Sequence, residues 1–153
     1  MMPSLALLRV ALLMILMLGV IGMGAELLLL GHTEDVWQWE PLAMFAVGLP
    51  VLMWHARMGT DWSRRFCLLV MAAFVVSGVI GLILHYRGNV EFELEMVPAL
   101  TGIDLLQEAM TGATPVLAPG AMIMLGLLGL LYAFFRDGND LPQDTSTTRG
   151  TDQ

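Results

Sequence analysis

The chain has 153 residues, with 14 acidic residues, seven arginines and no lysine, so its formal net charge is −7. Hydrophobic residues make up 57% of the sequence and charged residues only 14%, a balance that excludes an ordinary water-soluble domain and indicates a single membrane domain. The scarcity of positive charge also excludes a nucleic-acid-binding protein.

Four apolar runs are each long enough to form a transmembrane helix, and they cover residues 4–30, 41–57, 66–86 and 115–135. Because lipid cannot satisfy open backbone groups, all four are expected to be helical, which predicts an all-α membrane protein with a four-helix domain over residues 1–136. Arg9 precedes most of the first run, as a basic residue precedes the apolar stretch of a signal peptide. However, the bulky Met23 at the possible cleavage site and the apolar residues after Glu26 favour a retained span. We expect the second helix to begin at Pro41.

The arginines fix the expected orientation, because positive charge is retained on the cytoplasmic side. Only Arg87 falls on one side of the predicted membrane, and the other six arginines fall on the opposite side. Both termini are therefore expected to be cytoplasmic, in a bacterial inner membrane, with outer loops at 31–40 and 86–114. The polar segment 137–153 lacks apolar anchors and is expected to be a disordered cytoplasmic tail.

The two outer loops carry patterns that ordinary connectors lack. The first is acidic and contains Trp37 and Trp39. In the second, apolar residues alternate with glutamates, a period of two that predicts an extended segment with one apolar edge, formed by Val90, Phe92, Leu94 and Met96. Residues 102–111 then predict a short amphipathic helix, which is expected to lie on the membrane surface.

A few polar groups fall within the predicted spans, where ionisable residues are costly and invite a functional interpretation. Glu26 shares a helix face with two glycines, and His85 ends a stripe of small residues on the third span. Both lie at the same outer depth. One hypothesis is that the two faces pack together and that Glu26 pairs with His85. The alternative is that Glu26 reaches the interface or is protonated, and that His85 is an ordinary interfacial residue.

His32 lies in the same outer region and raises two weaker alternatives. With His85 and nearby carboxylates it could bind a divalent metal, although no pair has a diagnostic spacing. Alternatively, His32 and His85 could ligate a haem, with Gly81 leaving room for the flat ring. The thirteen methionines are scattered over all four spans, which favours core packing over copper binding.

No nucleotide-binding, redox or catalytic motif is present in the sequence, so a catalytic role is not expected. The features favour a non-catalytic structural or accessory subunit of a larger membrane complex. Its partners would be the lipid bilayer and other membrane subunits, contacted through the outer loops and the small-residue helix faces. Two alternatives remain open: a small oligomeric transporter or channel for protons or metal ions that uses Glu26, and a haem- or pigment-binding subunit that uses His85.

Overall fold

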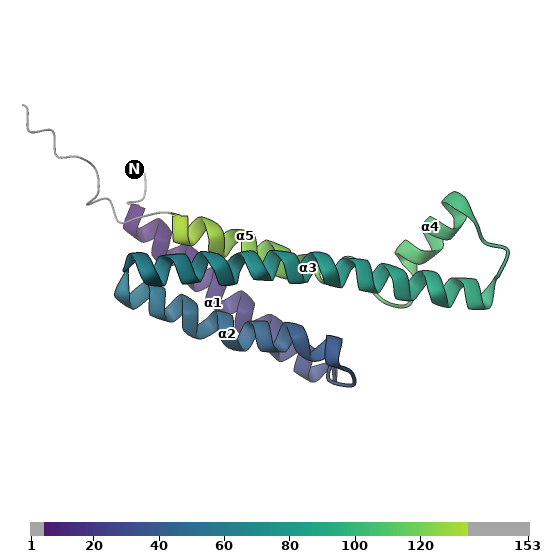
Figure 1. Ribbon diagram of the computed structural model, residues 1–153, viewed down its shortest axis with the longest axis horizontal. Helices are drawn as coiled ribbons and strands as arrows, with labels where there is room; N and C mark the ends of the chain where they lie inside the picture. Colours follow the sequence, from purple (N-terminus) through teal and green to yellow (C-terminus); the bar gives the residue numbers. More distant parts are fainter. Residues whose placement is uncertain (1–4, 135–153) are drawn as a thin grey trace, which may run out of the picture.

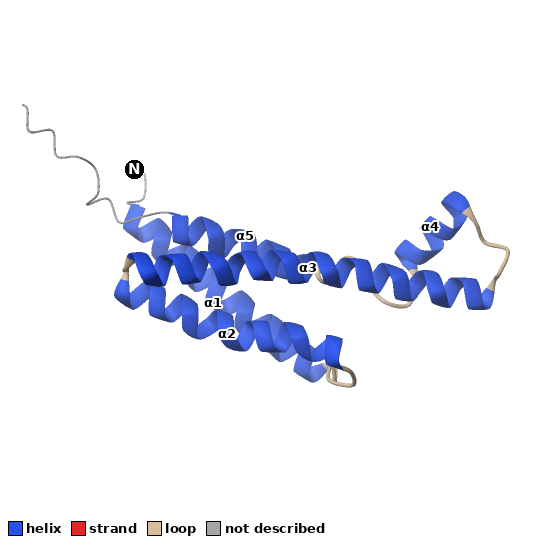
Figure 2. Cartoon of the chain, in the orientation of Figure 1, coloured by secondary structure: helices blue, strands red, loops and turns tan. Residues whose placement is uncertain are grey.

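The computed structural model describes residues 5–134, and within that range every regular element is a helix (Figures 1 and 2). In chain order the helices are α1 (Leu5–Leu29), α2 (Val36–Met58), α3 (Asp61–Met96), α4 (Gly102–Thr111) and α5 (Gly120–Phe134). Three of them, α1, α2 and α3, are long and apolar enough to cross a membrane. The all-helical, membrane-compatible fold is therefore confirmed, while the polar tail predicted at 137–153 lies outside the described residues.

The second helix begins five residues before the predicted start at Pro41. Asp35 caps it, because its side chain accepts a hydrogen bond of 3.0 Å from the backbone N–H of Gln38. The Gln38 side chain in turn accepts from the backbone N–H of Glu34 at 2.7 Å. These two bonds start the helix within the predicted loop, so Pro41 lies inside the helix and Trp37 and Trp39 lie on its first turn.

The extended segment predicted near residues 90–96 is wrong, because α3 continues as a helix to Met96. At 36 residues, α3 is about 54 Å long, well beyond the roughly 30 Å hydrocarbon core of a bilayer. The alternation of apolar residues and glutamates did not produce a strand, since no neighbouring strand is present in residues 5–134 to pair with an extended segment. Glutamate, leucine and methionine also favour helix over strand.

The predicted amphipathic helix is confirmed as α4, which lies beyond the end of the α1–α2 pair and turns back toward α3 (Figure 1). Asn89 of α3 holds it in place. The Asn89 side-chain amide donates to the carbonyls of Ala109, at 2.8 Å, and Thr114, at 2.7 Å, and its oxygen accepts from the Thr114 N–H at 3.1 Å. Asn89 is only 2% exposed, so one buried side chain joins α3 to the last turn of α4 and to the segment that follows it.

The centre of the bundle depends on close approach of helices at glycines. A Cβ atom added to Gly126 of α5 would lie 2.8 Å from the Met71 carbonyl oxygen of α3, and one added to Gly78 of α3 would lie 2.9 Å from the Ile123 backbone nitrogen of α5. Small residues of this kind allow helix backbones to pack closely in membranes. α3 and α5 are therefore the most closely packed pair of helices among the described residues.

The predicted pairing of the small-residue faces of the first and third spans is wrong. Helix α1 packs mainly on α2 and α5, and Gly19 of α1 lies against Leu125 of α5. Gly22, on the same face, has no heavy atom within 4 Å of an added Cβ. Because α2 and α5 cover the sides of α3, α1 is left with no extended contact to it.

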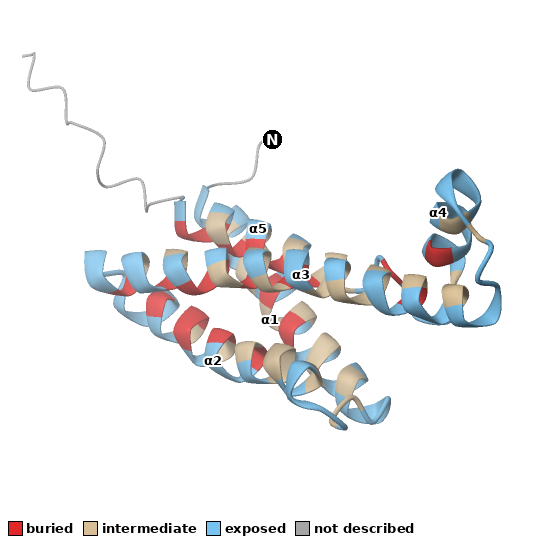
Figure 3. Ribbon diagram, turned by 45° about the vertical axis from the view of Figure 1, so that its right-hand side comes forward, coloured by how far each residue is buried: buried red, intermediate tan, exposed pale blue. Residues whose placement is uncertain are grey.

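The two ends of the bundle differ in packing. Residues 59–60 connect α2 to α3 at one end, and residues 30–35 connect α1 to α2 at the other; we call them the 59–60 end and the 30–35 end. Buried residues follow the surfaces where α2, α3 and α5 meet, but none lies on α1 after Val20 or on α2 before Phe45 (Figure 3). The helices are thus packed tightly toward the 59–60 end and loosely toward the 30–35 end.

Side chains from α1, α2, α3 and α5 meet at the 59–60 end. His55 and Ser63 are buried, and His55 Nδ1 lies 3.1 Å from Ser63 Oγ. The Tyr132 ring of α5 packs edge-on against the His55 ring at 5.6 Å, and the Arg9 guanidinium of α1 lies 5.4 Å from the centre of the Tyr132 ring. This cluster links α1, α2, α3 and α5 at the 59–60 end.

Candidate functional site

A cavity of about 480 Å³ opens at the 30–35 end between α1, α2, α3 and the segment that leads into α5. Its volume is in the range of small-molecule sites in proteins. The walls are mostly apolar, with a few polar side chains among them. The lining includes Met23, Glu26, Leu27, Leu30, His32, Asp35, Trp37, Gln38, Glu40, Pro41, Phe45, Ser77, Ile80, Gly81, Leu84, His85, Gly88, Thr114, Ala118, Pro119 and Met122.

One face of α3 forms the long wall of this cavity. Its residues recur every three or four positions, as one side of a helix requires: Ser77, Ile80, Gly81, Leu84, His85 and Gly88. The small-residue stripe seen in the sequence therefore does share one face. It does not pack against α1, but borders the space between the helices.

A part-buried polar contact in the cavity wall joins Glu40 to Ser77. The Ser77 hydroxyl donates to the Glu40 carboxylate with an Oγ to Oε2 distance of 2.6 Å. This length lies at the short end of the range for O–H···O hydrogen bonds. Glu40 belongs to the second turn of α2 and Ser77 to the middle of α3, so the bond brings a carboxylate toward the centre of the bundle.

His85 lines the cavity but is oriented by the backbone. Its Nδ1 lies 2.9 Å from the Pro115 carbonyl oxygen, which can only accept, so Nδ1 carries a proton and Nε2 of the neutral ring is an acceptor. The space that Gly81 was expected to leave for a flat ring is filled by Pro119, whose Cβ atom would lie 2.8 Å from a Cβ added at Gly81. The space beside Gly81 on which the haem alternative depends is therefore absent.

The three polar candidates taken from the sequence, Glu26, His32 and His85, all line this one cavity. Glu26 is exposed at its rim and His32 lies in the turn after α1. The structure thus brings the three residues to one site but does not pair Glu26 with His85, since His85 is bonded to Pro115. Within residues 5–134, no group of three or more His, Cys, Asp and Glu side chains is arranged to hold a metal ion.

Glu40 is the residue that sequence reasoning missed. It was assigned to an outer loop because Pro41 was expected to start the helix. The Asp35 and Gln38 capping pattern could have revealed that the helix starts earlier, which places Glu40 inside it. Its partner Ser77, 37 residues away, could not be found from any local pattern.

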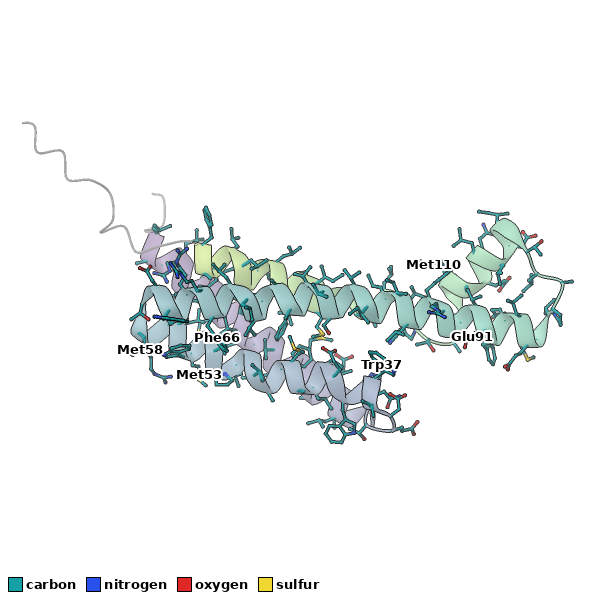
Figure 4. All side chains as sticks on the ribbon, in the orientation of Figure 1. Trp37, Met53, Met58, Phe66, Glu91 and Met110 are labelled. Carbon is teal, nitrogen blue, oxygen red and sulfur yellow. The ribbon has the colours of Figure 1, made fainter. Side chains whose placement is uncertain are left out.

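The predicted docking residues of the second outer loop lie on two different faces of α3. Residues four apart share a helix face, so Val90 and Leu94 fall on one side, where both are half-buried, and Phe92 and Met96 fall on another, where both are exposed. The single apolar edge expected of an extended segment is therefore wrong. Figure 4 labels Glu91 on this part of α3 and Met110 on α4.

Helix α4 carries a second apolar surface, which we call the α4 stripe: Ile103, Leu106 and Met110. These side chains recur at three and four residues and are all exposed, while Ala109 is fully buried against α3. The α4 stripe therefore faces away from the chain's own core. Trp37 and Trp39 in the first turn of α2 are also exposed, and Trp39 donates from Nε1 to the Thr33 carbonyl at 3.0 Å. Figure 4 labels Trp37 at this end of α2.

Comparisons with known protein families, with characterised proteins and with solved structures find no match to this chain.

Proposed function

We propose that the chain is a non-catalytic accessory subunit of a larger membrane complex and that it docks through the α3–α4 hairpin, residues 87–111. The observation that carries this proposal is the exposed α4 stripe on a helix that Asn89 fixes beyond the end of the α1–α2 pair. A rigid, presented apolar helix face is a common recognition surface for a partner protein.

The charge of the hairpin indicates the kind of partner. Five acidic residues and one arginine lie between residues 87 and 111: Glu91, Glu93, Glu95, Asp104, Glu108 and Arg87. A partner surface with basic residues around an apolar patch would complement it in both respects.

Docking on a partner protein suits α4 better than the predicted position on the membrane surface. Interfacial membrane helices carry lysine and arginine on their polar face, which attract anionic headgroups. Helix α4 carries Asp104 and Glu108 and no basic residue. Anionic headgroups would repel it.

In this proposal the chain crosses a bacterial inner membrane four times, with α5 as the fourth span. The 59–60 end and both termini lie on the cytoplasmic side, as the arginine distribution requires. The hairpin and the cavity then lie toward the periplasm. Cysteine-accessibility labelling in a Cys67→Ala background tests this arrangement. Cysteines at Glu34 and Glu91 should react with an impermeant reagent in intact cells, whereas a cysteine at Arg65 should react only after lysis.

The docking role is tested by purifying the full chain from its native membrane in mild detergent. A stoichiometric partner should co-purify, and Leu106→Gln in the α4 stripe should release it. Glu108→Asp, on the opposite side of α4 and unchanged in charge, is the matched control and should retain the partner. Purification of the wild-type chain alone, or equal recovery of the partner with Leu106→Gln, would contradict the proposal.

In the alternative of a small transporter or channel, Glu26 would bind the transported ion, and it lines the cavity at the 30–35 end. Transport also needs an opening at the opposite side of the membrane. There, His55, Ser63, Tyr132 and Arg9 bring four helices together, so a pathway would have to form between copies of the chain. The alternative of a haem-binding subunit would use His85 Nε2, and an absorption spectrum of the purified protein tests it.

A further inference from the structure

We infer that the cavity at the 30–35 end is a binding site for an amphipathic organic cation, that is, an apolar molecule that carries an amine, quaternary ammonium or phosphonium group. This inference is independent of the accessory role, because it rests on the interior of the bundle and not on the α3–α4 hairpin.

The charge of the lining selects a cation. Three carboxylates border the cavity, those of Glu26, Asp35 and Glu40, and no lysine or arginine is among the lining residues that the structure describes. Asp35 is engaged in capping α2, and Glu40 accepts from Ser77. Neither bond supplies a positive charge, so the negative charges of the site have no cationic partner within it.

Among the three carboxylates, Glu40 is the one bonded to helix α3, through Ser77. Glu40 is half-buried in the cavity wall, where a positive charge beside a carboxylate gains more than it does in bulk water. Ser77 provides a single donor, at 2.6 Å. His85 directs its Nδ1 to the Pro115 carbonyl and not into the cavity. A bound cation would give the Glu40 carboxylate the positively charged neighbour that the described lining lacks.

The remaining walls suit an apolar body attached to that cation. Leucine, isoleucine and methionine side chains from α1 and α3 form most of the surface: Met23, Leu27, Leu30, Ile80 and Leu84. Two aromatic rings, Trp37 and Phe45, come from α2, and rings of this kind attract cations through their faces. At about 480 Å³ the cavity can hold a molecule with several rings, far larger than a hydrated metal ion.

The test uses two probes of the same shape and opposite charge, tetraphenylphosphonium and tetraphenylborate. Binding to the purified full chain in detergent micelles is measured by equilibrium dialysis, with empty micelles subtracted. We expect saturable binding of tetraphenylphosphonium at one site per chain and only background uptake of tetraphenylborate. Partition into the micelle or into a purely apolar cavity would take up both ions.

Variants locate the site. Glu40→Gln keeps an oxygen that can accept from Ser77 but removes the charge, and Glu26→Gln does the same at the rim; each should weaken tetraphenylphosphonium binding by about tenfold. Glu34→Gln is the matched control, because Glu34 adjoins Asp35 but does not line the cavity, and it should leave binding unchanged. If Glu40→Gln fails to fold, the binding measured with Glu26→Gln tests the inference instead. Glu26 is exposed, so removing its charge disturbs no packing.

Three results would overturn the inference: no saturable binding of tetraphenylphosphonium, equal binding of tetraphenylborate, or unchanged binding in both Glu40→Gln and Glu26→Gln. The second would show that the cavity accepts apolar molecules such as lipid chains regardless of charge.

Discussion

The hydroxyl of Ser77 and the carboxylate of Glu40 lie 2.6 Å apart, although the two residues are separated by 36 others in the chain. The bond joins the second turn of α2 to the middle of α3 across the wall of the cavity. It is a specific polar link near the end of the bundle where buried apolar packing is sparse.

Ser77→Ala should therefore lower the stability of the helix bundle, because it leaves the Glu40 carboxylate without its donor among apolar side chains. The expected loss is about 0.5–1.5 kcal/mol of unfolding free energy, the net range for an intramolecular hydrogen bond. Unfolding in mixed detergent micelles measures it. Ser77→Thr keeps the hydroxyl and should retain more stability than Ser77→Ala; equal stability of the two variants would mean that the hydrogen bond contributes nothing.

Asn89→Ala should release α4 from α3 without unfolding the rest of the bundle. The substitution removes three hydrogen bonds at a buried position and leaves the Ala109 and Thr114 backbone groups without them. Hydrogen exchange followed by mass spectrometry should show faster exchange in residues 97–114 and little change in α1 and α2. Gln107→Ala on exposed α4 surface is the control. Unchanged protection of α4 in Asn89→Ala would mean that other contacts hold it.

Gly126→Ala should destabilise the α3–α5 pair, because the added methyl group would lie 2.8 Å from the Met71 carbonyl oxygen and 2.9 Å from the Val75 backbone nitrogen. Backbone atoms cannot move aside as a side-chain end can, so overpacking of about 1–3 kcal/mol is expected. Gly22→Ala adds the same group on α1, where no heavy atom lies within 4 Å, and should be neutral or slightly stabilising. Thermal stability in detergent compares the two, and equal effects would argue against close α3–α5 packing.

Ser63→Ala should loosen the 59–60 end. Ser63 Oγ donates its single proton to the Thr60 carbonyl at 2.9 Å, so at the 3.1 Å contact it must accept from His55, which places the proton of a neutral His55 ring on Nδ1. Nitrogen-15 spectra of labelled histidine should show this Nδ1–H form in the wild type. The expected cost of Ser63→Ala is about 1–3 kcal/mol, typical of a buried hydrogen-bonding group left without its partner. A His55 ring protonated at Nε2 in the wild type would contradict the assignment.

Local patterns in the sequence predicted much of the fold. Apolar runs long enough to span a bilayer located α1, α2 and α3, and the three- and four-residue spacing at 102–111 located α4. The same reasoning failed where two local signals competed. At 90–96 an alternation of period two was present, but the helix that began at Asp61 continued through it, because extending a formed helix costs less than starting new structure.

Part of the candidate site could likewise be predicted from the sequence, and part could not. The sequence by itself determined that Glu26, His32 and His85 would gather at one end of the helices, since depth along a membrane-spanning helix follows directly from residue count. It could not determine which helices are neighbours, and so it placed the face of α3 against α1 when α2 and α5 lie there. Only the tertiary structure brought Ser77 to Glu40, placed Pro119 over Gly81 and left a cavity beside them. Such contacts depend on how the helices are rotated and arranged in space, which no local pattern of residues encodes.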